Sequence, residues 1–343
     1  MDCIFLTKNN EKEYVDYIET KDTCIYHTLE WQKIIQNTYS FEQNYLLFKV
    51  DEHIVCVLNL FKVKGLIKGK RLISIPFSHN VPILSNDEES KISSINMLKD
   101  KFKEFKYIEF KDLITCNNEN IAIRNDNYNS IINNLNYESY ETYFKSLSDS
   151  SKNCIRKSQK FIKIKTGNSL EMFNDFYKII RQTRTRQGSP VYPKKLFSEI
   201  FHTMKEDVMI FSAFYEDKLC ASIMVFYHKK KALYAYGGSF NNEEAMNKRP
   251  MNLLLSEAIK FSFEKNHDSF ELGSTPKFNK GLLLFKKAFT HDINDISSTI
   301  INIRENLNIK RDGFLGKMTS FAIKNSPEFL NQMIGPFLLK EMA

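Results

Sequence analysis

The chain has 343 residues, of which 42% are hydrophobic and 26% charged, with a formal net charge of +8. This composition excludes a collagen-like, disordered or disulfide-rich miniature protein, and the length suggests about two domains. The apolar runs are only strand-sized and the six cysteines form no C-x-x-C pair, so we expect a soluble, reduced, cytoplasmic protein without a signal peptide, metal site or disulfide framework.

The first half of the chain predicts two helices followed by strands. Helical spacing covers 11–20 and 29–39, and a hairpin follows over 44–50 and 54–62, joined by the turn Asp51-Glu52. A third strand at 71–75 ends before Pro76, which cannot donate to a strand ladder. A helix at 88–105 then leads into an apolar strand at 107–114.

The second half repeats this order. Helices are predicted over 140–161, with an interruption, and over 170–187, with Gly188 as the expected left-handed cap. A hairpin at 208–215 and 219–228, with the turn Glu216-Asp217, precedes a strand at 233–239. A helix that opens at Pro250 then feeds a strand at 269–273.

Equivalent features of the two halves lie at a near-constant offset. Asp51 and Asp217 are 166 positions apart, and the final strands, from Tyr107 and Ser269, are 162 apart. This spacing indicates duplication of a unit of about 160 residues. We therefore predict an α/β fold with mixed α+β sheets, in which two domains at 1–136 and 137–300 each run helix–helix–hairpin–strand–helix–strand, followed by a helical tail at 301–343.

Such a topology predicts where a ligand binds. Open α/β sheets bind ligands where the strand order breaks, which in the second half falls between 233–239 and 269–273. The first of these strands contains Tyr236-Gly237-Gly238, where two residues without side chains let a ligand or another backbone approach closely. A glycine bulge that merely ends the strand explains the pair equally well.

Four segments in fixed order resemble one family: 151–157 (SKNCIRK), 184–193 (RTRQGSPVYP), 236–239 (YGGS) and 270–286 (FELGS…GLLLFK). The resemblance is to the FemAB-like branch of the GNAT-fold acyltransferases, which includes peptidoglycan-bridge aminoacyltransferases and acetyltransferase-like proteins from polysaccharide and cell-envelope loci. It covers about 26–296 and implies a tandem pair of GNAT-like domains, with the site in the second.

The resemblance implies an N-acyltransferase that moves an acyl or aminoacyl group to an amine of a cell-envelope sugar or peptide precursor, nucleotide-linked or lipid-linked. It implies no tightly bound cofactor; acyl-CoA or aminoacyl-tRNA would be the co-substrate. The sequence has neither the Q/R-x-x-G-x-G/A pyrophosphate loop of ordinary acetyl-CoA-binding enzymes nor the long coiled-coil insertion of some tRNA-using members, so both donors stay open. A non-catalytic binding or scaffold protein of an envelope-assembly pathway is the alternative.

The excess positive charge permits tRNA contact without requiring it. It comes from 40 Lys against 9 Arg, and a lysine excess spread along a chain is more often a solvated surface than a nucleic-acid face.

Two residues are candidates for catalysis. Lys286 stands in the Phe285-Lys286 pair that the resemblance places near the reacting groups, where a fixed cation would stabilise the oxyanion of acyl transfer. Glu271 alternates with Phe270 and Leu272 and would serve as a general base beside the cleft, or fix the backbone.

Five further residues are candidates for substrate binding: Arg156, Arg184, Tyr236, Gly237 and Phe285. Arg156 could clamp a phosphate of donor or acceptor, although the lysines around it, including Lys163 and Lys165, also suit a solvated basic helix. A cation near a helix C-terminus is a structural alternative for Arg184, and a core position is one for Phe285.

The tail carries six apolar residues with helical spacing: Phe329, Leu330, Met333, Ile334, Phe337 and Leu338. They form one stripe that we expect Gly335-Pro336 to break. The stripe either docks on the body of the protein, which is the default, or lies on the inner face of a membrane. Four basic residues upstream keep the membrane alternative open: Lys310, Arg311, Lys317 and Lys324.

Overall fold

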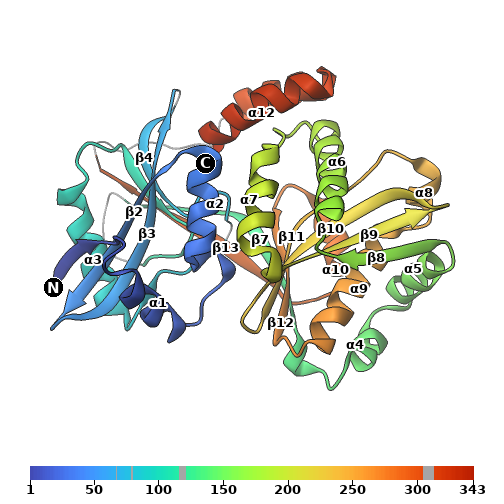
Figure 1. Ribbon diagram of the computed structural model, residues 1–343, viewed down its shortest axis with the longest axis horizontal. Coiled ribbons are helices and arrows are strands. Elements are labelled where there is room, and N and C mark those ends of the chain that lie inside the picture. Colours follow the sequence, from blue (N-terminus) through green and yellow to red (C-terminus); the bar gives the residue numbers. More distant parts are fainter. Residues whose placement is uncertain (67, 79, 116–120, 304–312) are drawn as a thin grey trace. The chain divides into compact units, whose positions relative to one another are not determined.

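The computed structural model describes residues 1–66, 68–78, 80–115, 121–303 and 313–343, and is shown in Figure 1. Two compact units are distinguished: unit 1 comprises described residues within 1–126, 296–311 and 337–343, and unit 2 those within 127–295 and 312–336. The predicted tail at 301–343 is therefore shared between the units instead of following them. Lys310 and Arg311 fall outside the described residues, as does the side chain of Lys317.

Unit 1 contains these elements up to residue 110: β1 (Asp2–Phe5), α1 (Glu11–Glu19), η1 (Ile25–His27), α2 (Leu29–Tyr39), β2 (Glu42–Val50), β3 (His53–Gly65), β4 (Gly69–Ser74), β5 (Leu84–Ser85), α3 (Glu88–Lys101) and β6 (Tyr107–Phe110). The β2–β3 and β3–β4 pairs are antiparallel, and α3 crosses over to make β4 and β6 parallel. A core of aliphatic and aromatic side chains forms between these strands and α3.

Unit 2 contains these elements: η2 (Asn134–Asn136), α4 (Tyr140–Ser146), α5 (Asp149–Gln159), β8 (Ile162–Gly167), α6 (Leu170–Arg186), α7 (Lys194–Met204), η3 (Lys205–Asp207), β9 (Val208–Tyr215), β10 (Lys218–His228), β11 (Lys231–Ser239), α8 (Glu243–Asn247), α9 (Pro250–Glu264), β12 (Ser269–Pro276) and α10 (Lys280–Lys287). Here β9–β10 and β10–β11 are antiparallel, and α9 makes β11 and β12 parallel.

The two halves therefore share one plan, which confirms the predicted tandem architecture, although the helix pair of the second half is α6 with α7 and not 140–161 with 170–187 as predicted. The order β1–α1–α2–β2–β3–β4–α3–β6 in the first half matches β8–α6–α7–β9–β10–β11–α9–β12 in the second. Both hairpin turns were correctly placed, because Asp51, Glu52, Glu216 and Asp217 all have positive φ, as a tight two-residue turn requires.

The prediction missed the strand that begins each half. In β8, Ile162 and Ile164 alternate with Lys163 and Lys165, so these two lysines lie on a strand and not on the basic helix considered as an alternative. The strand pairs with β9 on one side, and lysine is a residue that protects such sheet edges from further pairing.

Two long strands, β7 (Ile121–Asn133) and β13 (Ile293–Asn302), are added to the strands that the two halves share. β7 follows β6 in the chain but pairs with β12, whereas β13 follows α10 but pairs with β6. The strand order is β1-β2-β3-β4-β6-β13 in unit 1 and β7-β12-β11-β10-β9-β8 in unit 2. Each half thus takes its last strand from the other half of the sequence.

The chain ends in two helices, α11 (Gly313–Asn325) and α12 (Glu328–Met342). α12 continues through Gly335 and Pro336, so the expected break does not occur; one proline removes a single backbone hydrogen bond, and neighbouring contacts hold the helix. Gly335 is packed so closely on the backbone of Val191 that a side chain there would collide with it.

Candidate active site

The pairing between β11 and β12 ends early. Three register pairs join the strands, from Lys231–Ser269 to Leu233–Glu271, although β11 continues to Ser239 and β12 to Pro276. Just beyond the last pair, Gly273 has φ +72° and the register between β12 and β7 shifts. The predicted break in the sheet therefore exists, at the carboxyl ends of two parallel strands.

A bulge in β11 lies just beyond the last β11–β12 pair. Met224 of β10 pairs with Tyr236, and Val225 pairs with Tyr234, so Ala235 is an extra residue without a register partner in β10 or β12. Because the bulge removes one step of the alternation, Tyr234 and Tyr236 point to opposite faces of the sheet. The sequence suggested a bulge in this strand at Gly237-Gly238, two residues further along.

Figure 1 shows α6 and α7 on one face of the unit 2 sheet and α4, α5 and α9 on the other. Phe270 and Tyr234 belong to the core on the α9 side. By strand alternation, Glu271 and Tyr236 lie on the α6–α7 side. The predicted site residues of these strands therefore lie on different faces of the sheet from one another, and Glu271 and Tyr236 share the α6–α7 face.

Arg184 and Tyr236 are brought together through Tyr192. The Arg184 guanidinium stacks 4.4 Å from the centre of the Tyr192 ring and its Nε donates to the Pro190 carbonyl at 2.9 Å. The Tyr192 ring meets that of Tyr236 edge-on at 5.3 Å. Burial raises the pKa of the Tyr236 hydroxyl well above its ordinary value, so it stays protonated and able to donate. Tyr192 was missed as a site residue, although it lies in the RTRQGSPVYP segment.

Glu271 is half-buried on the same face. Asn129 Nδ2 donates to its Oε2 at 3.3 Å, while the flanking Phe270 and Leu272 are buried in the core. The predicted alternation along this strand is confirmed. Glu271 belongs to the last β11–β12 pair, which leaves its carboxylate beside the break.

Lys286 reaches the break from α10. Its side chain is 2% exposed, and its Nζ donates to the carbonyl oxygens of Gly273 at 2.7 Å and Ser274 at 3.0 Å. Burial lowers the pKa of the Lys286 amine to about 7. A neutral amine has two N–H groups and one lone pair, so these two bonds would leave the lone pair available. With a pKa near 7 the amine can hold or release a proton at neutral pH, whereas the sequence predicts a fixed cation at this position.

The other three candidates lie elsewhere. Arg156 is exposed on α5 and stacks 5.6 Å from the Phe144 ring on the α9 side of the sheet. Phe285 packs against Phe289 and the core. A side chain at Gly237 would collide with Tyr234, so the space beside this glycine is filled by the protein itself.

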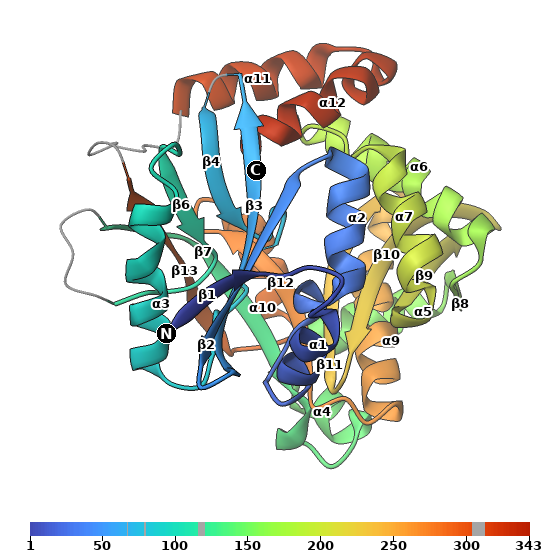
Figure 2. The same ribbon diagram turned by 60° about the vertical axis from the view of Figure 1, so that its left-hand side comes forward.

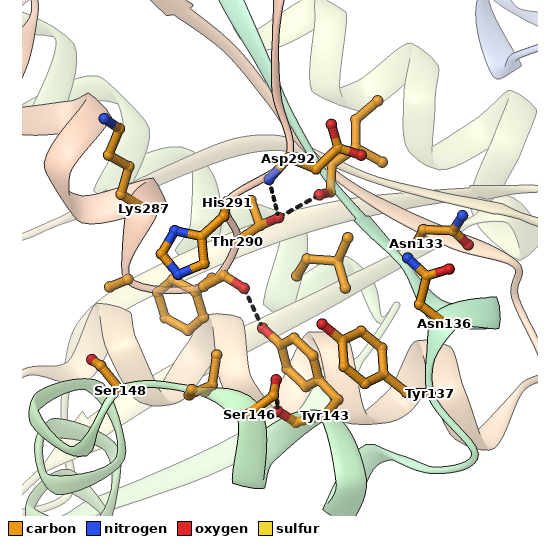
Figure 3. A pocket seen from close by; sticks show the side chains of 15 residues that line it. Asn133, Asn136, Tyr137, Tyr143, Ser146, Ser148, Lys287, Thr290, His291 and Asp292 are labelled. Atoms are coloured by element: carbon orange, nitrogen blue, oxygen red, sulfur yellow. Dashed lines mark hydrogen bonds between the residues drawn. The ribbon is translucent and has the colours of Figure 1, made fainter.

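A cavity of about 210 Å³ lies at the opposite end of β12 and is shown in Figure 3. Its lining includes Asn136, Tyr143, Lys287 and His291, but none of the predicted site residues. Polar groups of its wall bond within the protein, since the Tyr143 hydroxyl donates to the Phe289 carbonyl at 2.9 Å. We take the β11–β12 break as the candidate active site, because α/β sheets bind ligands at the carboxyl ends of parallel strands.

Repeated α/β halves, each with a crossover helix and a parallel strand pair, define a tandem GNAT-fold protein. Residues 79–320 match the family model FemAB-like, described as peptidoglycan biosynthesis/recognition. The match spans more than half of the chain, which therefore belongs to the FemAB-like family.

Solved structures show the same fold. FemX matches with a TM-score of 0.67 at 12% identity over 89% of this chain and 98% of its own. The C-terminal domain of a putative lysylphosphatidylglycerol synthetase from Agrobacterium fabrum matches with a TM-score of 0.55 at 10% identity, over 92% and 96%. A tandem GNAT protein from the clavulanic acid biosynthesis pathway has a TM-score of 0.55 at 6% identity, over 89% and 99%. No curated protein matches the sequence.

Among the helices that the structure describes, none combines the length and the apolar character needed to cross a membrane.

Proposed function

We propose that this chain transfers an acyl or aminoacyl group to an amine of a cell-envelope precursor, at the break between β11 and β12. The observation that carries the proposal is the meeting of three features there: strands that separate after three pairs, the bulge at Ala235, and Lys286 bound to the turn at Gly273. Membership of a family described by peptidoglycan biosynthesis/recognition supports the envelope as the setting.

The proposed reaction forms a bond between the amine nitrogen of the acceptor and the acyl carbon of the donor. The carbon–sulfur bond of a thioester or the carbon–oxygen bond of an ester then breaks, and the donor leaves with the electron pair. The attacking amine must lose a proton, which neutral Lys286 accepts through its lone pair. The main-chain N–H of Ala235, at the bulge, donates to the oxyanion. Arg184, Tyr192 and Tyr236 hold the acceptor, and Glu271 orients its amine.

The segment after β11 helps to choose between acyl-CoA and aminoacyl-tRNA as the donor. Free backbone N–H groups at a helix N-terminus form a favourable site for a pyrophosphate. Here α8 intervenes with Glu243 and Glu244 in its first turn, and α9 begins with Pro250, which has no N–H. These features disfavour CoA at this position, and we therefore propose the other donor class, an aminoacyl ester as on tRNA.

We therefore expect acetyl-CoA to bind more weakly than micromolar in calorimetry, with no transfer product. A screen of radiolabelled aminoacyl-tRNAs with nucleotide-linked and lipid-linked envelope precursors is expected to give a labelled acceptor. Tight, saturable and salt-insensitive binding of acetyl-CoA would contradict this choice of donor. Specific binding of an envelope precursor with no transfer from either donor class would instead favour the non-catalytic alternative.

A further inference from the structure

α12 turns its apolar residues away from unit 2. Phe329 is 60% exposed and Met333 is 74% exposed, and Leu330 and Ile334 are exposed as well. At 3.6 residues per turn these four positions fall on one side of the helix. We call them the outward face of α12. The default expectation that the apolar stripe docks on the body of the protein is therefore wrong for these residues.

The opposite side of the helix attaches it to unit 2 through polar contacts. Asn331 is fully buried; its Nδ2 donates to Thr185 Oγ1 at 3.0 Å, and its Oδ1 accepts from the Val191 N–H at 3.4 Å. Glu328 forms an ion pair with Arg181. Figures 1 and 2 both show α12 beside the ends of α6 and α7. The outward face is thus not needed to hold the helix, and a contiguous apolar surface of this kind marks an interaction site.

The segments next to α12 carry exposed lysines. Lys324 is exposed at the end of α11, and Lys194 and Lys195 are exposed at the start of α7, close in sequence to the Val191 backbone on which Gly335 rests. The acidic residue at the start of α12, Glu328, is neutralised by its ion pair with Arg181. An exposed apolar strip whose neighbouring segments carry exposed lysines is complementary to an anionic lipid surface, which offers an acyl layer below negative headgroups.

We propose that the outward face of α12 binds an anionic membrane surface. The four apolar side chains enter the boundary between headgroups and acyl chains, and Lys194, Lys195 and Lys324 contact the headgroups. This inference stands without the proposed reaction, because it concerns the binding of lipid alone; where both hold, the site would work on precursors at a membrane.

Vesicle co-sedimentation of the full chain tests this proposal. We expect binding to phosphatidylcholine vesicles that contain about 30% phosphatidylglycerol, and little binding to pure phosphatidylcholine. The double variant Phe329→Ser/Met333→Ser should weaken binding at least about tenfold. Lys194→Gln and Lys195→Gln should each weaken it about fivefold and reduce its sensitivity to salt. Phe278→Ser is the matched control, since Phe278 is 76% exposed outside this face and its loss should change nothing.

Three results would overturn the proposal. The double variant could sediment like the wild type, or the wild type could bind neutral and anionic vesicles equally. The wild type could also bind neither and form a concentration-dependent dimer in analytical ultracentrifugation that the double variant loses, which would assign the outward face to a second copy of the chain. Melting temperatures of all variants should equal that of the wild type, because the substituted side chains are exposed.

Discussion

Replacing Lys286 with methionine is expected to lower kcat roughly 10²–10³-fold, because it removes the group that accepts the proton of the attacking amine. The wild-type rate should rise as the pH increases through about 7, the value to which burial lowers the pKa of this amine. Below that pH the amine is protonated and has no lone pair to offer. The measurement is the pH dependence of kcat in both proteins with one donor and acceptor pair.

Lys280→Met is the matched control for this substitution. Lys280 is exposed on the same helix, so its loss should leave the rate unchanged. The adjacent Lys287 is unsuitable, because it lines the cavity at the other end of β12. Equal rates in the two variants would remove Lys286 from the mechanism. A rate that falls as the pH rises through about 7 would assign the lysine the cationic role that the sequence first suggested.

Lys286→Met should also change the free energy of unfolding, and two opposing effects contribute. The carbonyls of Gly273 and Ser274 lose their donor, at a cost of about 1–3 kcal/mol for each group left unsatisfied. In the wild type, the charged form of the Lys286 amine destabilises the fold, because its pKa is lower in the folded chain than in the unfolded chain. The stability of the wild type should therefore rise relative to the variant from about pH 7 up to the pKa of the unfolded chain. Thermal melting across this range measures the difference, and rates are compared below both midpoints.

The repeated architecture could be predicted from the sequence because its signals are local. Hairpin turns such as Asp51-Glu52 and the cap at Gly188 depend on neighbouring residues, and both have the expected positive φ. β7 and β13 were missed for the complementary reason. The sequence of β7, IAIRNDNYNSIIN, is rich in asparagine, a poor strand former, and its partner β12 is more than a hundred residues away.

The candidate site was predictable only in part. The break between β11 and β12 follows from element order, and Glu271 follows from strand alternation, so both could be inferred. The contacts of Tyr192 with Arg184 and Tyr236 depend on packing between a loop and a strand, which no spacing in the sequence predicts. The burial of Lys286 could not be predicted either, because nothing in the sequence distinguishes it from the other lysines among the 40.

Arg71 illustrates this limit most strongly and carries the largest effect that we expect on stability. The side chain is fully buried in β4 of unit 1. Its Nη2 donates to the carbonyls of Lys340 at 2.8 Å and Glu341 at 3.0 Å, and its Nε donates to that of Ala343 at 3.1 Å. These partners lie about 270 positions away in the sequence. The Glu341 carboxylate accepts in turn from the main-chain N–H of Lys68, at 3.4 Å.

Arg71→Leu is expected to destabilise unit 1 by about 3–5 kcal/mol. The variant leaves several carbonyls and the Glu341 carboxylate buried without their cation, and removing one partner of a buried charged network typically costs this much. Arg71→Lys should recover little, because an ammonium cannot reproduce the fork that reaches separate carbonyls. Lys70→Leu is the control, since Lys70 is exposed on the same strand. Denaturant unfolding measures the loss, and limited proteolysis should show early cleavage near the end of α12. Equal stability of the Arg71→Leu and Lys70→Leu variants would show that these bonds do not hold the last turn of α12 to β4.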